Sequence, residues 1–385
     1  MMEKDYLMIP GPTYVTPRVL RALSAPMINH RGPEFAALFV EVTGGVKRVF
    51  RTENDVLIFP AAGTGGMEAA VTNLLSPGDH VLVGVMGVFG QRFASIARAF
   101  GAEVEEIAVE WGEAVQPEEI RRRLETNPGI KAVIVTHNET STGVSLDLQG
   151  VAGVVREYPA LLVVDAVSSL GALPLFADEW GIDVVVAGSQ KALMIPPGLA
   201  LVSVSPAAWE AHASARMPRF YWDFSACRKS AEKSQNPYTP AVSLWYALRE
   251  SLEMIEEEGL DNIYRRHALL GAMARAGARA LGLELLVKDE KVASNTVTAV
   301  KAPAGIEVKP LRKVMQDRFG VTIAGGQARL EGKIFRIGHL GAVRPMDVVA
   351  TIAALEMSLR ELGYPAELGA GVAAAQKVWL EGGKE

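Results

Sequence analysis

A single lysine, Lys191, stands in an apolar segment that runs from Gly188 to Leu199. The run Val184–Ala187 precedes this segment and is typical of a buried strand, which places the lysine near that strand's C-terminal end. Burial lowers the pKa of a lysine, about 10.4 in water, by about 3 units or more, and a neutral amine forms a Schiff base with an aldehyde. In the alternative, the alkyl chain is buried and the ammonium group reaches water.

A carboxylate occupies the same kind of position at the end of another apolar run, Leu161–Asp165. A buried carboxylate is costly unless it is paired, and ligands of open α/β sheets bind outside the C-terminal ends of the strands. Asp165 is therefore a candidate ligand-binding residue. A helix N-cap or a structural salt bridge would explain the same aspartate.

A glycine-rich segment, Ala61–Ala70, follows a strand pattern and opens a helix pattern. Gly63, Gly65 and Gly66 would let backbone N–H groups approach an anion at the positive end of the helix dipole, and Thr64 adds a hydroxyl donor. The spacing matches neither the Walker motif nor the dinucleotide fingerprint. An ordinary strand-to-helix turn is the alternative.

Taken together, the three segments favour one interpretation. The C-terminal ends of parallel strands meet at one edge of a sheet, so an anion cradle, a carboxylate and an amine can converge there. Pyridoxal phosphate requires these parts: the amine binds its aldehyde, the carboxylate pairs with its pyridine nitrogen, and the cradle holds its phosphate. The sequence therefore predicts a pyridoxal-phosphate site.

Short apolar runs alternate with helix patterns over the first 240 residues. This alternation predicts an α/β domain with a mostly parallel, seven-stranded sheet between helices. The seven strand candidates are Val56–Phe59, Val81–Val85, Val104–Val109, Ala132–Thr136, Leu161–Asp165, Val184–Ala187 and Ala200–Val204.

The pattern changes after residue 240 and predicts a smaller α+β domain. Its helix candidates are Ala241–Glu258, Leu260–Leu281, Val308–Phe319 and Pro345–Leu362. Its strand candidates are Leu283–Val287, Thr296–Lys301 and Ile334–Ile337. We divide the chain into an N-terminal arm (residues 1–15), a large cofactor-binding domain (16–257) and a small C-terminal domain (258–385).

Composition excludes several classes of function. The 385 residues are 49% hydrophobic and carry a net charge of −5 of mixed sign, which argues against a nucleic-acid-binding protein. The charged N-terminus is unlike a signal peptide, and no apolar run approaches a membrane span, so we expect a soluble cytoplasmic protein. Cys227 is the only cysteine, and the six histidines lack metal-site spacing, so we expect no metal.

The chain resembles the class V aminotransferases of fold type I, especially the alanine:glyoxylate and serine:glyoxylate aminotransferases. The resemblance covers nearly the whole chain. The segments that carry it are Pro10–Thr13, Ala62–Glu68, Thr136–Gly143, Asp165–Ser169, Gly188–Lys191 and Phe335–Gly338. Their order along the chain is specific for the family and much less so for the substrate.

The resemblance implies roles for individual residues. Lys191 would hold the cofactor as an aldimine and move the substrate's α-proton, and Asp165 would pair with the ring nitrogen. Phe89 falls where relatives stack an aromatic ring on the cofactor, although an ordinary core aromatic is the alternative. The other implied cofactor contacts are Thr64, Gly65, Gly66 and Gln190 at the phosphate, Thr140 beside the ring hydroxyl, and Val167 on one ring face.

Arg336 matches the arginine that binds the substrate carboxylate, because a guanidinium fits a carboxylate with two parallel hydrogen bonds. The solvated face of an edge strand is the alternative, and the motif match together with the turn Gly338–Gly341 favours the carboxylate-binding role. Tyr238 and Thr239 resemble a segment that reaches the partner subunit's cofactor phosphate in a homodimer, although Thr239-Pro240 could simply begin a helix. His30 and Arg31 would either touch substrate or tie down the N-terminal arm.

The resemblance implies a ping-pong transfer of an amino group from alanine or serine to a 2-oxo acid, glyoxylate. Ureidoglycine:glyoxylate and phosphonate transaminases share most of the same motifs. A lyase such as a cysteine desulfurase would need a mobile cysteine, and Cys227 is not in the expected loop. A non-catalytic accessory subunit is the remaining alternative, and the intact Lys191, Asp165 and Arg336 argue against it.

Overall fold

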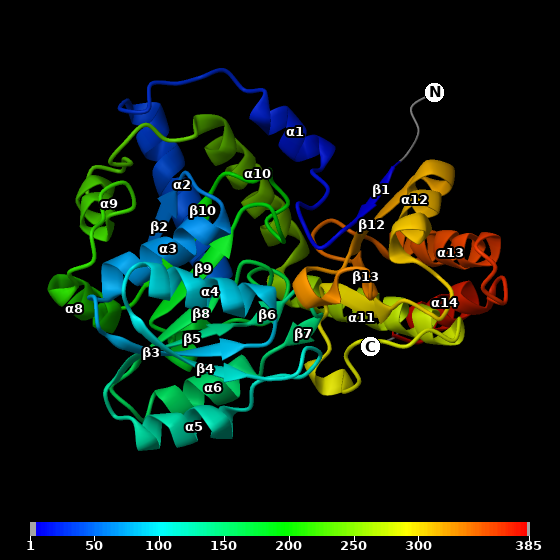
Figure 1. The fold of residues 1–385 in the computed structure, drawn as a ribbon. Coiled ribbons are helices and arrows are strands. Elements are labelled where there is room, and N and C mark those ends of the chain that lie inside the picture. Colours follow the sequence, from blue (N-terminus) through cyan, green and yellow to red (C-terminus); the bar gives the residue numbers. More distant parts are fainter. Residues whose placement is uncertain (1–4, 383–385) are drawn as a thin grey trace.

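The large part of the molecule is built on one central sheet (Figure 1). The computed structural model describes residues 5–382. Seven strands pair in the order β2-β10-β9-β8-β5-β3-β4, and only β10 runs antiparallel to its neighbours. In that order they span Asp55–Phe59, Ala200–Val204, Val184–Gly188, Leu161–Asp165, Ile130–Thr136, His80–Val85 and Glu103–Ala108. Every strand lies on one of the seven candidates, so the predicted fold class is confirmed.

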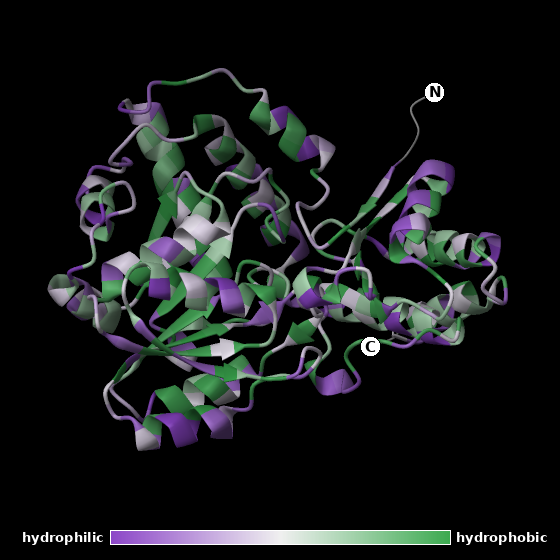
Figure 2. Ribbon diagram, in the orientation of Figure 1, coloured by the Kyte–Doolittle hydropathy of each residue, from purple (hydrophilic) through white to green (hydrophobic). Residues whose placement is uncertain are grey.

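Strand residues alternate between two hydrophobic cores. In β5, Ala132 and Ile134 pack into one core, whereas Val133 and Val135 pack into the other. Successive side chains of a strand point to opposite faces, so a sheet buried on both faces requires continuous apolar runs. Figure 2 shows these strands as hydrophobic and the outer surface of α5 (Pro117–Thr126) as largely hydrophilic.

Helices cover both faces of the sheet. One core includes residues of α3 (Gly63–Leu74), α4 (Val88–Ala99), α8 (Pro206–Ser214) and α9 (Phe224–Ala231). The opposite core includes residues of α1 (Pro17–Leu23), α2 (Pro33–Phe50), α5, α6 (Leu148–Val155), α7 (Ala177–Trp180), α10 (Val242–Glu258) and α11 (Leu260–Ala280). The two helices that open toward the predicted site, α3 and α4, therefore lie on the same face.

A second, four-stranded sheet forms the smaller part, with the order β1-β12-β13-β11. These strands span Tyr6–Met8, Val321–Gly325, Ile334–Gly338 and Val297–Lys301. A third core joins them to α11, α12 (Val308–Phe319), α13 (Pro345–Glu361) and α14 (Ala370–Gly382). A short hairpin, β6 (Asn138–Glu139) and β7 (Val144–Ser145), follows β5.

The smaller part departs from expectation at several places. The predicted strand Leu283–Val287 is wrong, since only Leu285 pairs with another residue, Val300, in an isolated bridge. The strand β1 was not predicted, because three residues are too few to show alternation. It lies beside β12, so the start of the chain joins a sheet made by its end (Figure 1). The helix α14 and the strand β12 were also not predicted.

The chain turns at Gly259, between the end of α10 at Glu258 and the start of α11 at Leu260. Our division into an arm and two domains stays a prediction. Within residues 5–382, no helix is both long enough and apolar enough to cross a membrane.

Two glycines in helices test the packing of this fold in opposite directions. A Cβ atom on Gly277 of α11 would lie 2.9 Å from Cγ1 of Ile352 on α13, whereas Gly153 of α6 has no neighbour within 4 Å. We expect Gly277→Ala to destabilise the protein by about 1–3 kcal/mol through overpacking. Gly153→Ala should stabilise it by about 0.5–1 kcal/mol through helix propensity. Urea unfolding of the two variants checks both signs, and equal shifts would contradict this account.

Candidate active site

Lys191 is buried beneath the N-terminal segment. The residue is 8% exposed, and its ammonium donates a hydrogen bond to the carbonyl oxygen of Pro10. Thr13 anchors the segment, because its N–H donates to Gln190 O at 3.0 Å and its hydroxyl to Lys191 O at 2.8 Å. A Cβ atom on Gly11 would lie 2.7 Å from Nζ, so only glycine fits over the lysine. The alternative in which the ammonium reaches water is therefore wrong.

The surroundings make the amine of Lys191 a better nucleophile. Burial lowers its pKa from 10.5 to about 8, and the nearby positive charges of Arg336 and Arg92 act in the same direction. The negative charges of Asp165 and Glu139 oppose the shift. With this pKa, roughly a tenth of the amine is neutral at pH 7, compared with far less for a free lysine, and the neutral form is the one that attacks an aldehyde.

Asp165 closes β8 at the same sheet edge. Its Oδ1 accepts a hydrogen bond from the Val167 N–H at 2.9 Å, and the residue is 4% exposed. None of the ion pairs found among residues 5–382 includes it, and it caps no helix, so neither structural alternative explains it. Burial raises its pKa to about 6, and Glu139 adds to this shift. Asp165 is therefore mostly ionised at pH 7 and suits a protonated ring nitrogen.

The glycines at the start of α3 allow neighbouring side chains to pack closely against the helix. A Cβ atom on Gly63 would lie 2.5 Å from the Val167 side chain, and one on Gly66 would lie 2.7 Å from Val186. At Gly65 a Cβ atom would meet the Trp222 ring at 3.1 Å. The helix has no side-chain cap, because its N-cap is Ala62, so the N–H groups of Gly63 and Thr64 remain available to an anion, whereas that of Gly65 donates to Ala62 O at 2.8 Å.

An unpredicted cation, Arg92, joins α3 to α4. Its guanidinium lies 4.9 Å from the centroid of the Phe89 ring and donates to the Thr64 hydroxyl at 3.3 Å. Phe89 is only half-buried, so the alternative of an ordinary core aromatic does not hold, and its contact with a cofactor stays a prediction. The arginine lies one helical turn after Phe89, a spacing that could have revealed it.

Arg336 lies inside the smaller sheet, on β13, and is 5% exposed. Its Nε donates to Gly325 O at 2.8 Å, and its Nη1 donates to Thr140 O at 2.8 Å and to Gln327 Oε1 at 3.3 Å. Burial lowers the pKa of the guanidinium to about 10. The alternative of a solvated strand face is therefore wrong, and Thr140 is brought to this arginine.

Val167 and Gln190 complete the strand-end group. The Val167 side chain packs against Gly63 and Gly188. The Oε1 atom of Gln190 is buried without a hydrogen-bond partner among the described residues. An unpaired buried amide oxygen is costly, which marks a place where a bound polar group would fit.

The predicted partner-reaching segment is tied down within its own chain by Arg31. The Arg31 guanidinium donates to the carbonyl oxygens of Asn236 (2.6 Å) and Pro237 (3.1 Å) and to Gln235 Oε1 (3.1 Å). Tyr238 stacks on Tyr221 at 5.3 Å, and Thr239 is exposed.

The alternative for Thr239 as a helix cap is wrong, because Ala241 is the N-cap of α10. The described contacts of Tyr238 join it to residues 220–221 rather than to Lys191. No described contact joins His30 to the residues around Lys191.

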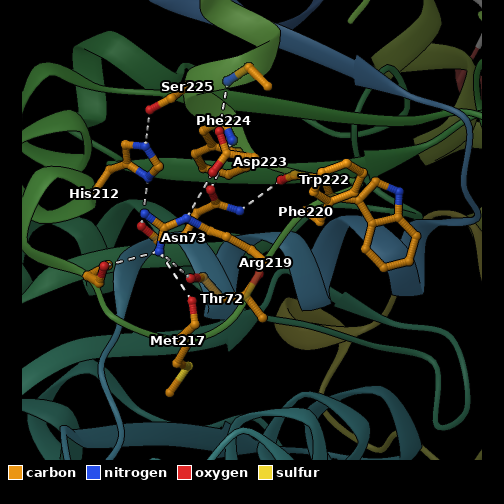
Figure 3. Close-up of polar contacts among 12 residues, drawn as sticks. Thr72, Asn73, His212, Met217, Arg219, Phe220, Trp222, Asp223, Phe224 and Ser225 are labelled. Atoms are coloured by element: carbon orange, nitrogen blue, oxygen red, sulfur yellow. Dashed lines mark hydrogen bonds and ion pairs between the residues drawn. The ribbon is translucent and has the colours of Figure 1, made fainter. Parts of the chain in front are cut away.

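A polar network fixes the segment that carries Trp222 (Figure 3). The Asn73 side chain on α3 donates to Trp222 O at 2.9 Å and accepts from the Phe224 N–H at 2.9 Å. His212 binds Asn73 O at 3.0 Å and the Ser225 hydroxyl at 2.6 Å. These contacts hold the Trp222 ring against Gly65 and hence against the start of α3.

The arrangement fits pyridoxal phosphate. It combines an amine of lowered pKa, a carboxylate at the end of the neighbouring parallel strand, an uncapped helix N-terminus and a half-buried aromatic ring. Within residues 5–382, no group of three or more His, Cys, Asp or Glu side chains could hold a metal ion. Cys227 is buried on α9, and burial raises its thiol pKa to about 12, which argues against a desulfurase.

The lowered pKa of Lys191 predicts a pH-dependent stability. Between the folded-state pKa of about 8 and the unfolded-state value of 10.5, the unfolded chain binds more protons, so stability rises with pH. Lys191→Met removes the buried charge and should stabilise the cofactor-free protein at pH 7 by up to about 3 kcal/mol. Urea unfolding at pH 7 to 10.5 should show this gain shrinking. A constant difference would contradict the shift.

Comparisons with known proteins agree with the geometry. The sequence model of aminotransferase class V matches residues 6–345. The chain is 48% identical to the small subunit of a soluble hydrogenase from Synechococcus sp., covering 98% of this chain and 99% of that protein. It is 40% identical to a serine–glyoxylate aminotransferase from Methylorubrum extorquens, covering 98% and 96%.

Among solved structures, ureidoglycine-glyoxylate aminotransferase from Bacillus subtilis superposes with a TM-score of 0.94, at 33% identity over 99% of both chains. The predicted resemblance is confirmed on sequence and on structure. The chain belongs to the class V aminotransferase family, whose members use pyridoxal phosphate.

Proposed function

We propose that this aminotransferase takes an amino group from alanine or serine and passes it to a 2-oxo acid, glyoxylate. The observation that carries the proposal is the buried amine of Lys191, whose pKa is affected by the charges of both Asp165 and the carboxylate-binding candidate Arg336 beneath the Pro10 carbonyl. Support for the substrates comes from the serine–glyoxylate aminotransferase relative.

Bound pyridoxal phosphate supplies an electron sink for the carbanion formed at the substrate's Cα. We assign to Lys191 the transfer of the α-proton, since its neutral amine can accept it. Asp165, mostly ionised at pH 7, keeps the ring nitrogen protonated. We assign the phosphate to Thr64, Gly65, Gly66 and Gln190, the ring faces to Phe89 and Val167, and the ring hydroxyl to Thr140.

Arg336 would bind the substrate carboxylate. Its Nε and Nη1 already donate to protein carbonyls, which fixes the plane of the guanidinium before substrate arrives. A fixed plane lowers the entropy cost of binding and orients the Cα–H bond relative to the cofactor ring. Burial away from water strengthens the attraction to a carboxylate.

The assembly and location are further parts of the proposal. We expect a cytoplasmic homodimer in which Tyr238 and Thr239 reach the cofactor phosphate of the partner subunit. Thr239 is exposed, and Arg31 holds the segment before Tyr238 in a defined shape. We therefore assign Arg31 to this segment rather than to the substrate.

A second candidate keeps the cofactor and changes the donor. The ureidoglycine-glyoxylate aminotransferase structure, at 33% identity over 99% of both chains, favours a ureidoglycine donor. The hydrogenase-subunit relative raises a different role, that of a subunit in a redox complex. Measurement of the purified protein with alanine, serine, aspartate and ureidoglycine as donors to glyoxylate separates these candidates. No turnover of alanine or serine would reject our choice of donor.

The cofactor assignment has a direct test. We expect the purified protein to bind pyridoxal phosphate and to show visible absorption above 400 nm, roughly where protonated imines of this cofactor absorb. Lys191→Ala should abolish this band, because it removes the buried amine to which we assign the imine. Lys229→Ala, which removes an exposed lysine of α9, should leave it intact. A band that survives in Lys191→Ala would contradict the role of Lys191.

Arg336→Lys tests the carboxylate site. Lysine keeps the charge but lacks the planar fork, so we expect kcat/KM for the amino donor to fall about a hundredfold, the value of a lost charge-assisted hydrogen bond. Binding of pyridoxal phosphate should change little. Arg312→Lys, at a cation that binds the Ile323 carbonyl, serves as the control. An unchanged kcat/KM would contradict the assignment of Arg336.

A further inference from the structure

The helix α4 begins without a cap of its own. Its N-cap is Gly87, which has no side chain to accept hydrogen bonds from the first turn. Three consecutive N–H groups, those of Val88, Phe89 and Gly90, therefore need acceptors from elsewhere. One of these residues, Phe89, carries the aromatic ring of the site.

The acceptors come from the hairpin that follows β5, about fifty residues later. The Glu139 Oε2 atom accepts from the Phe89 N–H at 2.9 Å and the Gly90 N–H at 3.1 Å. The Ser141 hydroxyl accepts from the Val88 N–H at 3.0 Å and donates to Glu139 Oε1 at 2.6 Å. The first turn of α4 is thus capped by side chains from another part of the chain.

Gly87 is explained by this arrangement. Its φ of 171° is extended backbone that any residue adopts, so conformation does not demand glycine. A Cβ atom there would lie 2.6 Å from Cδ of Glu139 and would also clash with the Ser141 hydroxyl. The missing side chain therefore makes room for the capping groups.

Glu139 is bound as a carboxylate. Its Oε1 accepts from the Ser141 N–H (3.1 Å) as well as the Ser141 hydroxyl, so each oxygen accepts two hydrogen bonds, and three of the four donors are N–H groups, which cannot accept a proton. The residue is fully buried, and burial raises its pKa while these hydrogen bonds oppose the rise. The positive end of the α4 dipole adds to their effect.

The same hairpin holds the substrate arginine. The carbonyl oxygen of Thr140, next to Glu139, accepts from Arg336 Nη1 at 2.8 Å. The ring of Phe89, one residue into the capped turn, is covered by the Arg92 guanidinium. Residues 139–141 therefore connect the aromatic ring on one side of the site to the carboxylate-binding group on the other.

We propose that Glu139 is a positioning residue whose ionised carboxylate, together with Ser141, caps α4 and thereby holds Phe89 against the cofactor ring. This inference rests on the proposed function, because the stacking of Phe89 on the cofactor is part of it. Glu139 acts through Phe89 and touches neither cofactor nor substrate in this assignment.

Glu139→Gln tests the inference. A glutamine has one acceptor oxygen, so its NH₂ group must face either the α4 N–H groups or the Ser141 N–H, and one set of donors is left unpaired. We expect the affinity for pyridoxal phosphate to fall about tenfold, as loss of a buried acceptor predicts. The circular-dichroism band of the bound cofactor should weaken, because the ring loses its fixed orientation.

The matched control is Glu356→Gln. Glu356 is also buried and accepts from a backbone N–H, that of Gly369 at 2.8 Å, but it lies on α13 in the smaller part. It should lower thermal stability without changing cofactor affinity or circular dichroism. Ser141→Ala, which removes one capping acceptor, provides a milder variant and should give a smaller loss of affinity.

A double-mutant cycle that combines Glu139→Gln with Phe89→Leu tests whether Glu139 acts on cofactor binding through Phe89. If Glu139 acts through Phe89, the loss of affinity in the double variant is smaller than the product of the two single losses. Unchanged cofactor affinity and circular dichroism in both Glu139→Gln and Ser141→Ala would overturn the inference, and so would independent effects in the cycle. If the wild-type protein binds no pyridoxal phosphate, the proposed function fails, and this inference fails with it.

Discussion

The site depends on one constraint: charged side chains are buried at one edge of an open sheet whose two faces are covered by helices. Both faces of the sheet are covered by helices, so its polar groups can gather only where the strands end. Lys191 and Asp165 stand at such ends, and each has a pKa shifted toward neutrality by burial. The smaller part supplies Arg336 to the same region through Thr140. Burial of these charges costs free energy of folding, and the same burial shifts the pKa values of Lys191 and Asp165 toward 7.

The elements around this edge are locked by close packing rather than by long-range charge. Glycines at 63, 65 and 66 bring α3 against the Val167, Trp222 and Val186 side chains, so the helix that would meet a phosphate cannot slide. The hydrogen-bond network of Asn73 and His212 fixes Trp222 in turn (Figure 3). These contacts explain why the glycine-rich start of α3 can serve as a rigid phosphate cradle.

The sequence predicted the large sheet well because six of its seven strands are largely apolar runs; the exception is the edge strand β4, which carries three glutamates. It failed where the pattern is short or interrupted: β1 has three residues, and Leu283–Val287 is apolar but forms only one bridge. Lys191, Asp165 and Arg336 were predictable from their positions and from family resemblance. Arg92 could have been found from its position one turn after Phe89, but Glu139 and Trp222 could not, because their roles arise from contacts between residues that are about 50 to 160 positions apart in the chain.

The pairing of β1 with β12 has a consequence for the folding of the protein during its synthesis on the ribosome. The partner strand of Tyr6–Met8, Val321–Gly325, is translated more than three hundred residues later. Domains fold as units during synthesis, so the large sheet can form while β1 still lacks its partner strand β12. The segment that covers Lys191 follows directly after β1. Until Val321–Gly325 has been translated, the contacts of Thr13 with Gln190 and Lys191 can hold this segment over the lysine, but its pairing with β12 cannot.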